Sequence, residues 1–144
     1  MLILAGIIQD QAYYEQYVAP HIDNDKVSYA GSVGPAERNR MLGKAYALLH
    51  PIQFDEPFGL SVIESMACGT PVIAFDRGSM SELIENGNSG FLVNNVDEAI
   101  ETVARIKDLD RAACRCYVER HFTVERMISE YIQVYEKILD AQRL

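Results

Sequence analysis

Two glutamates, Glu56 and Glu64, stand on either side of a segment that predicts a turn from a strand into a helix. The helical pattern begins at about Gly59, a residue type that lets the backbone approach a ligand closely. The first amides of such a helix, those of Gly59, Leu60 and Ser61, have no acceptor within the helix. Together with the helix dipole they can bind an anion such as a diphosphate.

The two carboxylates have different places around this predicted anion site. Glu64 lies one turn below Leu60 on the same helical face, so it can accept hydrogen bonds from a pair of hydroxyls just beyond the phosphate, as a ribose offers. Glu56, on the loop before the helix, can face the far side of the anion, where a sugar would lie. The pattern therefore predicts a site for a sugar joined to a nucleoside diphosphate.

Strand-like apolar runs alternate with helical patterns along most of the chain. We expect strands at residues 2–8, 27–30, 47–50, 72–75 and 91–93, and helices at residues 10–18, 35–45, 59–67, 79–84, 96–106, 111–120 and from residue 123 onward. The first strand is expected to be covered on both faces, and a serine at 79 or 81 is expected to cap its helix. The alternation predicts an α/β fold, a doubly wound parallel Rossmann-like sheet with helices on both faces and further helices after it. Ligands of such sheets bind at the carboxyl ends of the strands.

Composition narrows the function classes. The chain has 144 residues, of which 49% are hydrophobic, and a formal net charge of −8. This charge argues against a nucleic-acid partner, which would need a basic surface. The three cysteines, Cys68, Cys114 and Cys116, have neither the number nor the spacing of a disulfide framework or a zinc site, so we expect reduced thiols, no metal and a cytoplasmic protein. No apolar run approaches the ~18 residues of a membrane span.

The residues from Glu56 to Val72 resemble the signature of the group 1 retaining glycosyltransferases, which have the two-domain GT-B architecture. The shared features are the Glu-x7-Glu pair, the run Pro-Phe-Gly-Leu within it and the run Met-Ala-Cys-Gly-Thr-Pro-Val after it. Residues 76–82 are similar to the family's Gly-Gly-x-x-Glu turn, with Ser79 in place of the second glycine. Residues 27–31 and 88–93 also fit the family.

The resemblance implies roles for individual residues. Glu64 would bind the donor ribose, and Glu56 would contact the donor sugar as the catalytic residue. The backbone amides of Phe58, Gly59 and Leu60 would meet the sugar or the diphosphate. Four further residues would border the donor: Gly31 and Val33 beside the base, and Gly78 and Ser79 in the second turn. The donor would be a UDP- or GDP-sugar, transferred with retention of configuration and without a cofactor or a bound metal.

The resemblance also indicates what the rest of the enzyme would supply. Residues 1–144 match a single nucleotide-sugar-binding domain, the C-terminal half of a GT-B enzyme. The family's preceding strand, with its Gly-Arg pair and following Lys, and its N-terminal acceptor-binding domain have no counterpart in the sequence. We therefore expect an N-terminal domain or partner chain to complete the site, with any peripheral membrane association through that half. The chain alone is expected to bind donor weakly and to be inactive.

Two other functions are open at this point. A sugar-nucleotide epimerase shares the architecture, and a non-catalytic nucleotide-sugar-binding or assembly subunit would keep the fold without the chemistry. The Glu-Pro-Phe-Gly-Leu run favours a transferase, and retention of both Glu56 and Glu64 argues against a purely structural subunit. For His50, at a strand end beside the expected site, a structural role is the simpler interpretation.

Overall fold

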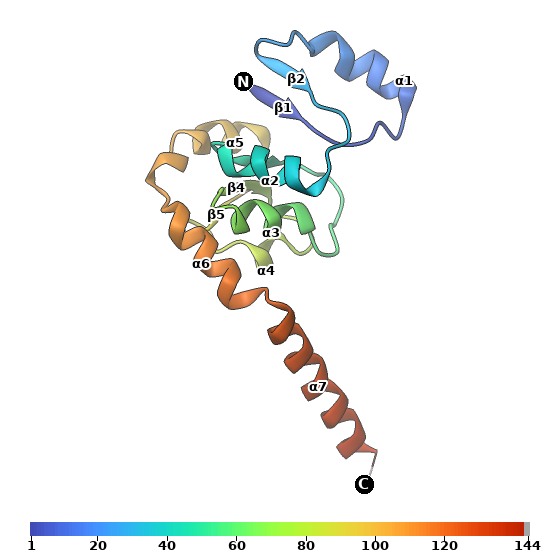
Figure 1. Cartoon of the computed structure of the whole chain (residues 1–144), viewed down its shortest axis with the longest axis vertical. Coiled ribbons are helices and arrows are strands. Elements are labelled where there is room, and N and C mark those ends of the chain that lie inside the picture. The colour runs from blue at the N-terminus through green and yellow to red at the C-terminus, as the bar shows by residue number, and fades with distance from the viewer. Residues whose placement is uncertain (143–144) are drawn as a thin grey trace. The chain divides into compact units, whose positions relative to one another are not determined.

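The structure is a computed structural model that describes residues 1–142. The chain divides into two compact units, Met1–Arg40 and Met41–Leu144. Each is a piece of parallel sheet with its helices, and the strands form two separate sheets with the orders β1-β2 and β3-β4-β5 (Figure 1). The predicted α/β fold class with parallel strands is confirmed. The prediction that residues 1–144 form one domain stays a prediction.

The first unit holds a two-stranded parallel sheet and a helical segment. Strands β1 (Leu2–Leu4) and β2 (Val27–Tyr29) pair from Leu2↔Val27 to Leu4↔Tyr29. Between them, Asp10 caps α1 (Gln11–Tyr13) by accepting from the Tyr13 amide at 2.9 Å. The chain continues through the π-helical turn η1 (Tyr14–Val18) and the 3₁₀ turn η2 (Ala19–His21).

The expectation of a first strand covered on both faces is wrong. Strand β1 ends at Leu4 instead of residue 8, and Leu2 and Ile3 are 42% and 44% exposed. Among the described residues of this unit, β1 pairs with β2 alone and no side chain is fully buried. The apolar run therefore has a strand partner on one edge and only partial cover from the helical segment, where the Tyr14 ring of η1 lies 5.3 Å from the Tyr29 ring of β2.

The second unit is built on three parallel strands, and α2 (Pro35–Lys44) leads into it. Strands β3 (Leu48–His50), β4 (Val72–Phe75) and β5 (Gly90–Val93) pair in that order, with every residue of the central β4 buried. Helix α3 (Leu60–Ala67) connects β3 to β4, and α4 (Met80–Leu83) connects β4 to β5. The segment holding Glu56 and Glu64 is therefore a strand-to-helix crossover, as predicted.

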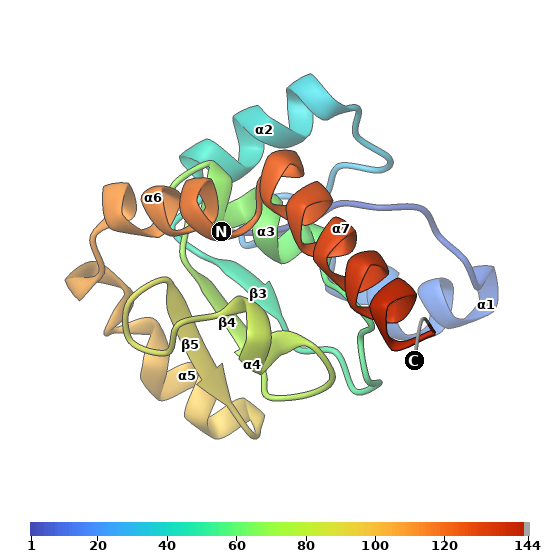
Figure 2. The ribbon, with the colours of Figure 1, turned by 90° about the horizontal axis from the view of Figure 1, so that it is seen from below.

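Figure 2 shows helices on both faces of the β3-β4-β5 sheet. Alternate residues of β4 enter two cores on these opposite faces, as expected from the period-2 geometry of a strand. Val72 and Ala74 pack with α3, α4 and α6 (Arg111–His121). Ile73 and Phe75 pack with β5, with the 3₁₀ turn η3 (Ile106–Asp108) and with α5 (Val96–Val103). Helices on both faces of a parallel sheet make this unit doubly wound.

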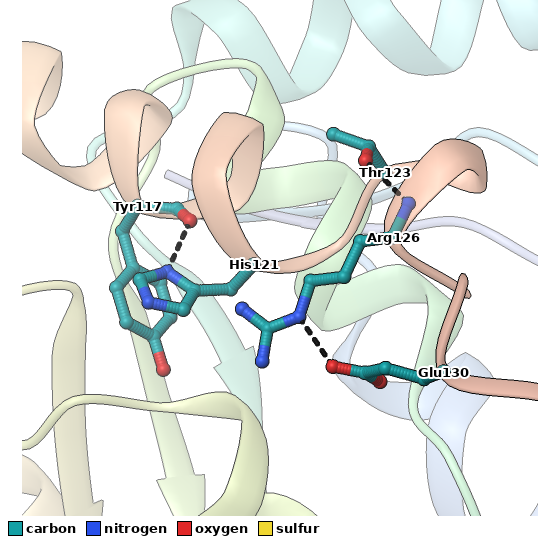
Figure 3. A network of polar contacts seen from close by, with 5 residues as sticks. All are labelled: Tyr117, His121, Thr123, Arg126 and Glu130. Carbon is teal, nitrogen blue, oxygen red and sulfur yellow. Dashed lines mark hydrogen bonds and ion pairs between the residues drawn. The ribbon is translucent and has the colours of Figure 1, made fainter. Parts of the chain in front are cut away.

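The last helix, α7 (Val124–Ala141), begins at a capped junction with α6 (Figure 3). Thr123 Oγ1 accepts from the Arg126 amide at 3.2 Å, and Arg126 Nε donates to Glu130 at 2.7 Å. On the α6 side, His121 Nδ1 donates to the Tyr117 carbonyl at 2.8 Å. None of the residues of α7 is buried, although the helix carries a broad apolar face. No helix in the described part of the chain has the length and apolar character to cross a membrane.

Candidate functional site

The amino end of α3 offers unpaired backbone donors. Gly59 precedes the helix with φ +92°, in the left-handed region, and its carbonyl accepts the Val62 amide at 3.1 Å. The amides of Gly59, Leu60 and Ser61 donate to no acceptor within residues 1–142. Because the positive end of the helix dipole lies there too, this turn can bind an anion.

Gly59 is required here by space as well as by conformation. A Cβ at this position would lie 2.7 Å from Met80 Cε and 3.0 Å from Leu83 Cδ1, so α4 packs directly against the turn. Glu56 lies on the same turn, with its Cγ 3.7 Å from that Cβ position. No sequence pattern indicates that Met80 and Leu83 support this turn, because they are ordinary apolar positions of a short helix.

Residues 55–58 rest on the turn that follows β4. Gly78 has φ +54°, and a Cβ there would lie 2.5 Å from both the amide nitrogen and the carbonyl oxygen of Glu56. The Ser79 amide donates to the Glu56 carbonyl at 2.9 Å, and Ser79 Oγ donates to the Phe58 carbonyl at 2.7 Å. Ser79 therefore stands at the cap position of α4, but its side chain bonds the neighbouring loop instead of capping the helix.

The predicted site residues fall into two groups. Glu56, Phe58, Gly59, Gly78 and Ser79 meet in the second unit through these contacts, with the Phe58 side chain 48% exposed. Leu60 and Glu64 follow on α3. The remaining two, Gly31 and Val33, belong to the first unit, and their place beside the nucleotide base stays a prediction.

His50 ends β3 with a buried nitrogen that has no partner. Its Nε2 makes no hydrogen bond within the described residues. His50 follows Leu48 by two residues, so it lies on the face of β3 that α3 covers. Burial lowers the pKa of His50 below its ordinary value of 6.5, and the negative charge of Glu56 opposes this shift. Burial of the imidazole therefore favours its neutral form.

This burial predicts a pH dependence of stability. Because the folded pKa of His50 lies below the unfolded one, the unfolded chain binds more protons, and stability falls as the pH drops below about 6.5. Urea unfolding of the wild type and of His50→Gln between pH 5 and 8 measures the effect. We expect the wild type to lose stability relative to the variant on the acid side only. Parallel curves for the two proteins would contradict the burial of the imidazole.

The described residues contain no group of three or more His, Cys, Asp or Glu side chains that could hold a metal ion. The three cysteines are free thiols, and burial raises the pKa of Cys114 to about 11. Its Sγ donates to the Ser89 carbonyl at 3.3 Å. Cys114 is therefore part of the core and not a reactive thiol.

Comparison with known proteins decides the family. The model of "Glycosyl transferases group 1" matches residues 1–117. The chain belongs to this family. The GT-B resemblance drawn from the sequence is thereby confirmed, whereas retention of configuration and the function of the Glu-x7-Glu pair stay predictions.

The relatives of this glycosyltransferase chain are longer proteins. A probable sucrose-phosphate synthase of Thermosipho melanesiensis is 40% identical over 86 residues, which are 57% of this chain and 20% of that protein. The O-antigen chain mannosyltransferase RfbU of Salmonella typhimurium is 34% identical over 113 residues, 75% of this chain and 31% of the relative. The chain thus spans a third or less of the length of these relatives.

Solved structures share the fold over nearly the whole chain. The sucrose-phosphate synthase of Thermosynechococcus elongatus matches with a TM-score of 0.76 and 27% identity over 97% of this chain and 39% of that one. The Anabaena protein HepE, crystallised with UDP-glucose, matches with a TM-score of 0.73 and 20% identity over 94% of this chain and 40% of that one.

Proposed function

We propose that this chain forms the donor site of a group 1 glycosyltransferase and binds a nucleoside-diphosphate sugar at the amino end of α3. The observation that carries the proposal is the set of unpaired amides of Gly59, Leu60 and Ser61 beside the side chain of Glu56. In this position the amides donate to the diphosphate, and the helix dipole stabilises the negative charge that develops on it as the sugar leaves.

The two glutamates contact different parts of the donor beyond the diphosphate. Glu64, one turn along α3, accepts hydrogen bonds from the ribose hydroxyls, while Glu56 contacts the transferred sugar and holds it for reaction. The place of Gly31 and Val33 beside the base stays a prediction from the family resemblance. Family membership and the complex of HepE with UDP-glucose support a UDP- or GDP-sugar as the donor. Sugar transfer with retention of configuration is the reaction that we assign to the complete enzyme.

An acceptor-binding half completes the enzyme in this proposal. Its motivation is that the chain spans 20% to 31% of the relatives described above, so much of each relative lies outside the matched region. The exposed apolar face of α7 suits contact with such a half. The chain alone is then expected to bind donor without transferring sugar at a measurable rate, and its cytoplasmic location stays a prediction.

Calorimetry with nucleotides tests the donor site on the chain as it is. We expect UDP or GDP to bind at least about tenfold more tightly than the matching monophosphate, because the second phosphate gains charge-assisted hydrogen bonds at the helix end. ADP serves as a comparison for the base. Equal affinities for the diphosphates and the monophosphates, or no heat with any of them, would contradict the proposal.

A further inference from the structure

Ser79 makes two hydrogen bonds to the loop that carries Glu56, one from its backbone and one from its side chain. The amide donates to the Glu56 carbonyl at 2.9 Å, and the hydroxyl donates to the Phe58 carbonyl at 2.7 Å. The residue is only 9% exposed. Its single hydroxyl proton is therefore already used within the protein and is not available to a ligand.

The bond to Phe58 fixes the direction of the next amide. In a trans peptide the carbonyl of one residue and the N–H of the next point in opposite directions, and no described peptide bond is cis. Since the Phe58 carbonyl points toward Ser79, the Gly59 N–H points away from it. That N–H is one of the three unpaired donors at the amino end of α3.

No other described hydrogen bond holds this peptide plane. The neighbouring Glu56–Pro57 bond has no N–H because proline lacks one, so Pro57 offers no second donor. Gly59 has no side chain, so its φ and ψ have few steric limits and do not resist rotation of the peptide plane. Below the turn, Met80 and Leu83 provide packing contacts but no hydrogen bond.

We infer that Ser79 is a positioning residue, which orients the Gly59 amide for the donor diphosphate without touching the donor itself. The inference rests on the proposed function and gives Ser79 a different role from the direct donor contact expected from the sequence. It also explains why a serine at position 79 can replace the second glycine of the Gly-Gly-x-x-Glu turn. Glycine has no hydroxyl that could donate to the Phe58 carbonyl.

The test compares Ser79→Ala with two matched variants of the 144-residue chain. Ser79→Thr keeps the hydroxyl, and Ser81→Ala removes an exposed hydroxyl two residues away on α4. The ¹⁵N order parameter of Gly59 measures how rigid the peptide plane is. Calorimetry with the diphosphate that binds the wild type measures how each variant changes the affinity. Circular dichroism verifies that each variant is folded.

We expect the Gly59 order parameter to fall from about 0.85, the value of rigid backbone, toward 0.6 in Ser79→Ala. The diphosphate should bind about three- to tenfold more weakly, which is the loss expected for a misdirected neutral hydrogen bond. Ser79→Thr and Ser81→Ala should resemble the wild type in both measurements. If Ser79→Ala weakens binding of the diphosphate but not of the monophosphate, the lost interaction is the one with the second phosphate.

Two results would overturn the inference. One is a Gly59 amide that stays rigid in Ser79→Ala, and the other is a mobile amide with unchanged affinity. Absence of diphosphate binding to the wild-type chain overturns the proposed function instead. The order parameter is measured without ligand, so the two failures are read from different signals.

Discussion

Alanine at Gly78 is expected to destabilise the chain by about 3 kcal/mol and to abolish measurable diphosphate binding. The added Cβ would lie 2.5 Å from the nitrogen and oxygen of Glu56 and 2.8 Å from the Asp55 carbonyl carbon, all backbone atoms that cannot rotate away. The loop must therefore shift, at a cost of about 1–3 kcal/mol for the overlap and about 1–2 kcal/mol for a left-handed residue with a side chain. Urea unfolding and calorimetry measure the two effects.

Gly87 provides the control for backbone conformation. Its φ of +84° is left-handed like the +54° of Gly78, but a Cβ there would meet nothing within 4 Å. Gly87→Ala should therefore lose only the conformational part, about 1 kcal/mol, and should bind the diphosphate as the wild type does. Similar losses in both variants would show that Gly78 is needed only for its turn and not to seat the Glu56 loop.

The sequence was sufficient to predict the crossover that holds the candidate site. Apolar runs at 47–50 and 72–75 gave strands close to the observed β3 and β4, and the glycine before residue 60 marked the start of α3. These signals are local, because each depends on the types of residues within a few positions of one another. The same holds for the last helix, which was expected from residue 123 onward and begins at Thr123, the residue that caps α7.

The support of the site was not predictable in this way. Ser79 looked like a helix cap, yet its hydroxyl bonds Phe58, which is 21 residues away in the sequence. That choice depends on how closely two turns approach, and the approach depends on Gly78 having no side chain. The unpaired nitrogen of His50 is likewise a product of packing, since nothing in the residues around position 50 distinguishes a buried imidazole from an exposed one.

Exposure of the first strand was also outside the reach of local patterns. A continuous apolar run predicts burial on both faces, but burial needs other elements to cover the run. Residues 1–40 supply one parallel partner and a short helical segment, and none of their side chains is fully buried. The apolar pattern at Leu2 and Ile3 thus indicates a strand suited to a buried environment. In the structure the two residues are 42% and 44% exposed.

Removal of the Glu64 carboxylate is expected to weaken diphosphate binding by about 30-fold. Hydrogen bonds to a charged group contribute about 1.5–3 kcal/mol, and about 1.4 kcal/mol corresponds to a tenfold change in affinity. The sign of the effect is diagnostic. A carboxylate that is merely near a diphosphate repels it, so its removal would strengthen binding. Removal of a carboxylate that accepts hydrogen bonds from the ribose hydroxyls would instead weaken binding.

A double-mutant cycle separates these two effects for Glu64→Ala. The second change is made in the ligand, by use of a nucleoside diphosphate that lacks both ribose hydroxyls. If Glu64 binds those hydroxyls, the dideoxy ligand should bind the variant and the wild type almost equally, and the coupling should account for most of the 30-fold loss. Glu101→Ala, which removes an exposed carboxylate on α5, should leave both ligands unaffected. A full loss with the dideoxy ligand would mean that Glu64 acts on the fold or the phosphates, and the ribose assignment would be wrong.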